Sequence, residues 1–495
     1  MFKKMNSQKL KQAFGLCRDI YTVLYISFFA ILFFIPVQNA LGNITTFLYL
    51  AIAGLGAALL FAAVFLNRSA FLKGPNLILS LFAVASLIST AVNFRYEPVS
   101  NIKEICWMCI MFFLIQAVDD SCPREKLTRL FRLVSNIFIV IWFVGVFVSF
   151  CQFVAGYGAW ISTPYNDNDV HRVGFVEGRL FGVFGDPNYA AIGSFFAIVL
   201  SVYNMTERAL GKLVRACYIV SMVFEYFYII LSGSRAALIS TAVAVFFIAF
   251  FLTLKYKAVR DKSTVVRVLL SVASAAVSAA LLVIISNLIK EILIYLPTLY
   301  SEICNALGLR VKQNSVANLH RPDLEEDSDI SNNRFKIWID SIAVWKTSPV
   351  VGATPRGYLK YAMENLGDLY IVKRGYIIHN AYLSVLLFTG IIGALLVIAF
   401  IVYAAYLVLR FLFKSNSKSC SDYNRVLILS AVIVAEAVSS VALSQMFFSH
   451  MVTDALFWMT VGYTFYFIRQ SETVSACSVV AEKQSGQTDP DPSQA

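Results

Sequence analysis

The stretch "YFYIILSGSRAALISTAVAVFF", residues 226–247, places one arginine between two long apolar segments. Only three small residues accompany Arg235 in the connection. The apolar segments, 213–231 and 236–254, are each close to the ~20 residues that a helix needs to cross the hydrocarbon core of a membrane. The pattern predicts two spanning helices with a very short connection, and it leaves a permanently charged side chain at the membrane boundary.

The same apolar pattern recurs along the whole chain. The chain has 495 residues, of which 58% are hydrophobic and only 14% are charged, a balance far from that of a soluble protein. About twelve segments are long enough to span a membrane. The predicted spans are 20–37, 44–66, 75–93, 102–118, 131–155, 187–204, 213–231, 236–254, 265–289, 380–409, 425–448 and 454–468. We therefore predict an all-α, polytopic integral membrane protein.

The basic residues predict which loops face the cytoplasm. The net charge of +11 indicates topology and not nucleic-acid binding, because Lys and Arg collect in cytoplasmic loops of membrane proteins. A cytoplasmic N-terminus places most of the 41 Lys and Arg residues in inside loops and the two termini. With this sidedness Arg235 and all four histidines, among them His320, lie on the outside.

A long outer loop, 290–379, separates the ninth and tenth predicted spans. Its start, 291–309, is expected to form an interfacial helix, and its acidic run, 323–329, a solvated hinge. A second amphipathic helix is expected from 332 onward, with its tryptophans at headgroup depth. Its apolar residues have helical spacing, and either of two asparagines can cap it: Phe335, Trp338, Ile342 and Trp345, after Asn332 or Asn333.

We divide the chain into four parts by these features. They are the first five spans (1–177), a central region that includes the outer loop (178–409), the last two spans (410–469) and a polar tail expected to be disordered in the cytoplasm (470–495).

Four short polar stretches meet at the outer face under this topology. They are "GRLFGVFGDPNYAA" (178–191), "SGSRAAL" (232–238), "NNRFKIW" (332–338) and "RGYIIHNAYL" (374–383). Each also has a purely structural interpretation. Asp186 precedes a proline at a helix start and is a natural cap, and Arg334 or His379 could simply contact lipid headgroups.

Arg235 is harder to explain structurally, because the short connection is expected to hold its side chain in the protein interior. Its planar guanidinium is suited to phosphate oxygens, and a salt bridge with Asp186 or Glu177 is the alternative.

The order and sidedness of these stretches resemble those of the O-antigen ligase and O-antigen polymerase superfamily. The motifs that carry the resemblance are "GSRAAL", "NNRFKIW" and "HNAYLSVLLFTGIIGALL", and it covers roughly 178–400. It implies a bacterial, multi-pass protein of the cytoplasmic membrane that joins an undecaprenyl-diphosphate-linked glycan to an acceptor hydroxyl on the outer face. The implied acceptor is a glycan or a glycolipid, and membrane lipids are further expected partners. No cofactor is expected.

The resemblance also suggests roles for single residues. Arginines at the diphosphate would stabilise the charge that develops on the leaving group without a metal ion. One carboxylate, Asp186, is too few for a Mg²⁺ site. Attack from the face opposite the diphosphate would invert the anomeric centre. The expected residues are His379 as the base, Arg235 and Arg334 with Arg179 and Arg374 as weaker candidates for the diphosphate, and Asp186, Asn188 and Asn380 in support.

Two alternatives stay open at this point. A lipid-linked oligosaccharide flippase or another polysaccharide transporter could also have twelve spans, and Glu225 and Glu436 lie within predicted spans as in many transporters. The 90-residue outer loop favours the transferase. The sequence hardly distinguishes a ligase from a polymerase, and we favour a polymerase slightly.

Overall fold

The computed structural model describes residues 2–118, 122–163, 166–207, 210–311, 313–319, 333–415 and 422–485. Within them, ten helices are long and apolar enough to cross a membrane, which confirms the all-α, polytopic class. The spans are formed by α1 (Phe2–Ile31), α3 (Ile44–Leu66), α5 (Pro75–Val92), α6 (Pro98–Ile110) with the π-helical turn η1 (Met111–Ile115), α7 (Arg124–Val154), α8 (Pro187–Glu207), α9 (Lys212–Leu231), α10 (Arg235–Lys255), α12 (Thr264–Leu293) with α13 (Leu296–Ala306), and α17 (Ala381–Lys414).

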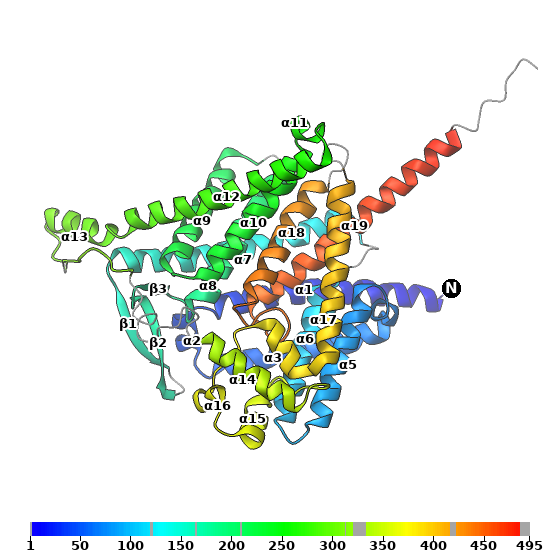
Figure 1. Ribbon diagram of the computed structural model, residues 1–495, viewed down its shortest axis with the longest axis horizontal. Coiled ribbons are helices and arrows are strands. Elements are labelled where there is room, and N and C mark those ends of the chain that lie inside the picture. The colour runs from blue at the N-terminus through cyan, green and yellow to red at the C-terminus, as the bar shows by residue number, and fades with distance from the viewer. Residues whose placement is uncertain are drawn as a thin grey trace, which may run out of the picture.

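Shorter helices and a small sheet complete the structure. The short helices are α2 (Ile35–Leu41), α4 (Arg68–Phe71), α11 (Lys257–Arg260), α14 (Arg334–Thr347), α15 (Tyr358–Leu366) and α16 (Tyr370–Arg374). Figure 1 shows α13, the strands and α14 to α16 on the side of the bundle away from the N-terminus, α11 and the far end of α19 (Val452–Ser485). This arrangement agrees with the expected outer location of the loop, while the cytoplasmic location of both termini stays a prediction.

The last two predicted spans differ most from expectation. Helix α18 (Tyr423–Ser439) ends well before residue 448, and the chain from 440 to 451 is irregular. Asp454 holds this irregular segment, because its carboxylate accepts hydrogen bonds from Met446 N (2.8 Å), Met451 N (3.0 Å) and Ser449 Oγ (2.5 Å). The count of twelve spans therefore stays a prediction.

The C-terminal tail also differs from its prediction. Helix α19 continues to Ser485, so the expectation of disorder is wrong for 470–485. The rest of the tail lies outside the described residues.

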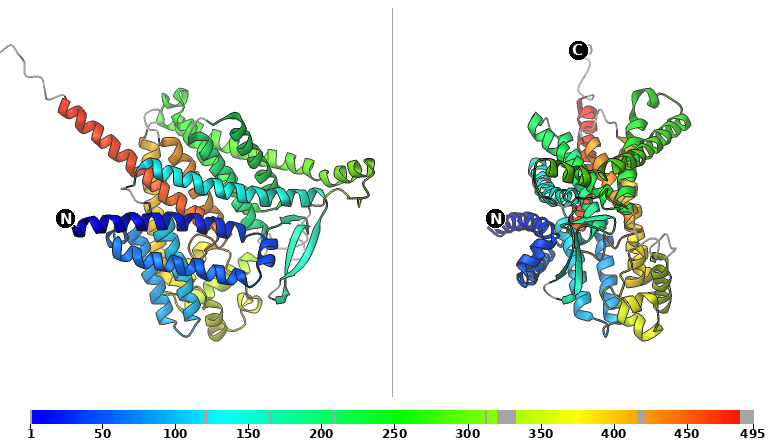
Figure 2. Two further views of the ribbon diagram at one scale, coloured as in Figure 1. Left: turned by 180° about the vertical axis from the view of Figure 1, so that it is seen from behind. Right: turned by 90° about the vertical axis from the view of Figure 1, so that its left-hand side faces the viewer.

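A three-stranded antiparallel sheet lies between α7 and α8, where the sequence analysis predicted no strand. It consists of β1 (Gly158–Thr163), β2 (Asn166–Val176) and β3 (Arg179–Gly182), in that order. The β3–α8 connection pairs with the start of α2, since Ile35 N donates to Val183 O at 2.8 Å. Figure 2 shows the β1–β2 hairpin extending away from the helices. The sheet thus fixes the chain just before the predicted site residues of α8.

Helix α17 is broken in its first third. Gly390 adopts a left-handed φ of 61°, so the helix changes direction there. The break removes carbonyl groups from the helical hydrogen-bond pattern, and such groups need other partners in a membrane.

The loop that precedes α15 supplies those partners. Ala353 N donates to Leu387 O at 2.8 Å, and Thr354 N donates to Phe388 O at 3.2 Å. Ser89 Oγ of α5 adds a second bond to Phe388 O at 2.7 Å. The outer loop is therefore attached to the spanning bundle through the break in α17.

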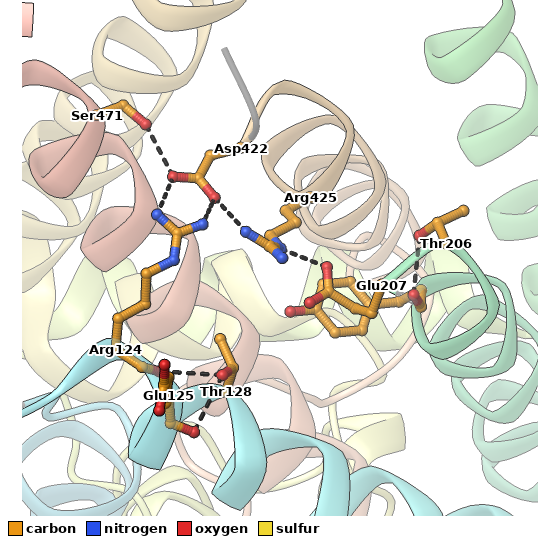
Figure 3. Close-up of polar contacts among 9 residues, drawn as sticks. Arg124, Glu125, Thr128, Thr206, Glu207, Asp422, Arg425 and Ser471 are labelled. Carbon is orange, nitrogen blue, oxygen red and sulfur yellow. Dashed lines mark hydrogen bonds and ion pairs between the residues drawn. The ribbon is translucent and has the colours of Figure 1, made fainter. Parts of the chain in front are cut away.

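An ionic cluster joins four helices at the opposite end of the bundle (Figure 3). Asp422 accepts from Arg124 Nη1 of α7 at 2.9 Å, from Arg425 Nη1 of α18 at 2.6 Å and from Ser471 Oγ of α19 at 3.1 Å. Arg425 also pairs with Glu207, the last residue of α8. Because both carboxylates are buried and paired, removal of one partner would leave a buried charge uncompensated.

We predict that Gly390→Ala destabilises the protein. A Cβ at this position would lie 2.2 Å from Val350 O and would occupy a left-handed backbone conformation. Strain of this kind costs about 1–3 kcal/mol per residue, so the thermal unfolding midpoint in detergent should fall. Gly54→Ala in α3 is the control, since a Cβ there meets nothing within 4 Å. An unchanged midpoint for Gly390→Ala would contradict the assigned break.

Candidate functional site at the outer face

The start of α8 carries the first group of predicted site residues. Asp186 Oδ1 accepts hydrogen bonds from Asn188 N at 2.7 Å and Tyr189 N at 3.3 Å. This geometry confirms that Asp186 caps α8, as the structural interpretation of its sequence predicts. The cap fixes the backbone of the first helical turn and with it the direction of the Asn188 side chain.

Arg179 joins the start of α8 to the short connection between α9 and α10. Its Nε donates to Ser232 O at 2.8 Å, and its Nη2 donates to Asn188 Oδ1 at 2.8 Å. The residue is only 8% exposed. Arg179 therefore positions the connection between α9 and α10, and it is the buried arginine of the group.

Arg235 is the first residue of α10 and is exposed. The expectation of an interior side chain is wrong, because the preceding residue, Ser234, is the buried cap and accepts from Ala237 N. Of the two carboxylates considered as partners, Glu177 pairs with Arg172 at 3.0 Å. The second, Asp186, has Oδ1 engaged by the backbone of α8.

Arg334 begins α14, directly after Asn333. Asn333 occupies the cap position with a left-handed φ of 62°, but its side chain makes no capping bond to the helix. The predicted side-chain cap is therefore wrong for Asn333, and Asn332 lies outside the described residues.

Helix α14 packs against protein along one face. Ile337, Ser341 and Val344 are buried on it. Trp338 Nε1 donates to Ile378 O at 3.1 Å, so this tryptophan holds the segment that leads to His379. The sequence predicted headgroup contact for Trp338, since helical spacing alone does not distinguish a protein partner from a lipid.

His379 lies between α16 and α17 in a left-handed conformation, with φ of 52°. The next residue, Asn380, caps α17 by accepting from Leu383 N at 2.9 Å. One residue further, Ala381 N donates to Ser440 O of the α18–α19 connection at 2.8 Å. The backbone on the C-terminal side of the histidine is thus fixed by two elements.

The imidazole of His379 is mostly buried and is influenced by charges from two other elements. Its pKa is lowered to about 4, first by burial and then by the positive charge of Arg334, while the carboxylate of Asp186 acts in the opposite direction. Its Nδ1 is buried and has no hydrogen-bond partner among the described residues. The histidine is therefore neutral at pH 7, and Nδ1 can accept a proton.

Five of the predicted residues are linked in one region. Arg179, Asp186 and Asn188 are joined directly, and Arg334 and His379 interact across α14 and α17. Arg374 is an exposed residue at the end of α16, and within the described part of the chain it makes no hydrogen bond or ion pair with the others. Its proposed role stays a prediction.

The other histidines contact other groups. His171 is on β2. His450 stacks on Trp107, with ring centroids 5.2 Å apart, and its ring also contacts Tyr49. His320 lies outside the described residues, as does the predicted acidic hinge. No group of three His, Cys, Asp or Glu side chains suited to a metal ion occurs in the part of the chain that the structure describes.

Residues 218–398 match the sequence family described as O-antigen ligase. This region is similar to an O-antigen ligase domain. The match confirms the resemblance that the sequence motifs suggested, and it includes Arg235, Arg334 and His379. No curated protein matches the chain. Arg179 and Asp186 precede the matched region. The hydrogen bond that positions the α9–α10 connection, which carries Arg235, therefore comes from outside that region.

We predict that Arg179→Lys impairs this site. A lysine carries the charge, but its single ammonium cannot reproduce the planar pair of bonds to Ser232 O and Asn188 Oδ1. Proteolysis at the α9–α10 connection should become faster, because the turn loses its support. Arg172→Lys on β2 is the control, since Arg172 makes an exposed ion pair. Equal cleavage rates for the two variants would exclude the positioning role.

Proposed function

We propose that this membrane protein transfers a glycan from a polyprenyl diphosphate to an acceptor hydroxyl on the outer face of the bacterial cytoplasmic membrane. The O-antigen ligase domain and the spanning helices support a membrane enzyme of glycosyl transfer. The observation that carries the proposal is the position of His379, a neutral base beside Arg334 and close to the α8 cap. Undecaprenyl diphosphate is the expected carrier.

The arginines would act on the donor. Arg235 is exposed at the start of α10, and Arg334 begins α14, so both can approach a diphosphate from outside the packed bundle. As the anomeric bond breaks, negative charge increases on the leaving diphosphate. Guanidinium groups bind that charge more strongly than they bind the ground state, which accelerates the step.

His379 would act on the acceptor. The acceptor oxygen attacks the anomeric carbon, its proton passes to the imidazole, and the electron pair of the broken C–O bond leaves with the polyprenyl diphosphate. This displacement inverts the anomeric centre and uses only side chains of this protein. A bound diphosphate would also offset the charge of Arg334 and so raise the pKa of His379 from its low value, which makes the histidine a stronger base when donor is present.

Variants of the two key residues test the proposal. Arg235→Ala and His379→Ala should abolish joined glycan on a gel, while lipid-linked glycan accumulates on the outer face. Arg235→Lys should restore little, because a point charge cannot replace the planar fork. Arg68→Ala in α4, at the other end of the bundle, is the control. Accumulation on the inner face would instead indicate a flippase.

The same gel separates a ligase from a polymerase once the chain is deleted. Loss of a polymerase leaves single repeats, whereas loss of a ligase leaves long chains on the carrier.

The lowered pKa of His379 predicts a characteristic pH dependence. Protonation removes the base, so kcat/KM for the donor should fall as the pH falls through about 4, the pKa in the free protein. The fall in kcat should occur at higher pH, since the bound diphosphate offsets Arg334. Initial rates of glycan joining in membrane vesicles between pH 3.5 and 8 would measure both profiles. A kcat profile that falls at the same pH as kcat/KM would disprove the coupling.

A further inference from the structure

A cavity of about 190 Å³ lies beside the segment that carries the predicted base, and neither the base nor any of the predicted diphosphate residues lines it. Its wall is formed by α6, the loop before α15, the start of α15, the start of α17 and the irregular segment after α18. Ile378 and Ala381, on either side of His379 in the chain, are part of this wall. A molecule in the cavity would therefore contact residues on both sides of His379 in the chain and none of the predicted diphosphate residues.

The wall contains an acidic and a basic group side by side. Glu104 is only 3% exposed, and its Oε2 accepts from Arg356 Nε at 2.8 Å and from Arg356 Nη2 at 2.6 Å. Half of the Arg356 side chain stays exposed. Glu104 Oε1 lies 3.8 Å from His450 Nδ1, which is beyond hydrogen-bond distance. This oxygen has no hydrogen-bond partner within the described chain, and the same holds for the buried Ser444 Oγ and Gln445 Oε1 of the wall.

These wall groups select the chemistry of a ligand. Carboxylate oxygens only accept hydrogen bonds and guanidinium groups only donate them. A hydroxyl does both, so neighbouring hydroxyls can bind Glu104 and Arg356 together. A phosphate would be repelled by Glu104, and an ammonium group would be repelled by Arg356. The apolar part of the wall includes Tyr358 and Leu359, against which the C–H face of a sugar ring can pack.

The size of the cavity agrees with a small ligand. Pockets for drug-sized molecules have volumes of roughly 300–1,000 Å³. The volume here is smaller, so it suits one ring and not an oligosaccharide.

We propose that this cavity binds one sugar ring of the acceptor glycan beside the segment that carries His379. The inference rests on the proposed glycosyl transfer and adds the acceptor subsite to it. Glu104 and Arg356 bind adjacent hydroxyls, and Leu359 contacts the ring. The acceptor is thus recognised without a diphosphate group.

Two probes separate this subsite from the donor site in the full-length protein in nanodiscs. The first is acceptor glycan released by mild acid from the producing strain, which carries no diphosphate: the repeat unit of its surface polysaccharide as the acceptor of a polymerase, and its lipid-anchored core sugars as the acceptor of a ligase. The second is undecaprenyl diphosphate. Leu359→Trp should fill the cavity and abolish binding of the released glycan, while undecaprenyl diphosphate binds as in wild type. Met363→Trp, one turn further along α15 and exposed, is the matched control and should bind both.

A milder variant, Glu104→Gln, keeps the shape of the side chain. It should weaken binding of the released glycan about tenfold, the loss typical of one charged hydrogen bond. Wild-type glycan binding by Leu359→Trp overturns the proposal. If Leu359→Trp disturbs binding of both probes, Glu104→Gln decides, and unchanged glycan binding by that variant overturns the proposal. Retained undecaprenyl diphosphate binding by Arg235→Ala would instead contradict the donor assignment and leave the cavity result unaffected.

Discussion

The break in α17 imposes the constraint on which the outer half of the structure depends. A membrane offers no water to the carbonyls that a broken helix releases, so protein groups must bind them. The loop before α15 does this with the backbone of Ala353 and Thr354, and Ser89 adds a bond from α5. The energetic need to satisfy α17 therefore also fixes the outer loop. Since α14 and His379 lie on either side of that attachment, their relative position follows from it.

The candidate site is built mainly from the ends of helices and not from their faces. Asp186, Ser234 and Asn380 each cap the helix that follows, and the predicted functional side chains are their near neighbours in sequence. Caps fix a backbone direction at low cost. Arg179 then joins two of these helix starts directly. The charged groups of the site are therefore held mainly by hydrogen bonds between residues that are close in sequence. Arg179 adds a contact between two more distant segments.

The sequence predicted the features that depend on apolar length and on charge asymmetry. Most spans needed nothing more, while the outer location of the long loop stays a prediction. Features that depend on tertiary contacts were harder to predict from the sequence. The interior arginine is Arg179 and not Arg235, because burial is decided by the neighbouring sheet, and nothing in the spacing of 158–182 marked that sheet. The early end of α18 was hidden by the apolar character of 440–448, and the grouping of Glu104 with Arg356 joins residues 252 positions apart.

The ionic cluster of Figure 3 has a mechanical consequence for the other end of the molecule. Helix α8 runs from the cap at Asp186 to Glu207, and its 21 residues make a rod of about 30 Å. A tilt of about 2° at the Glu207 end would move the far end by about 1 Å over that length. Displacements of this size can cost about a hundredfold in rate when reacting groups must be aligned. The pairing of Arg425 with Glu207 thus limits how far α8 can tilt. It therefore also limits how far Asn188, at the other end of the helix, can move.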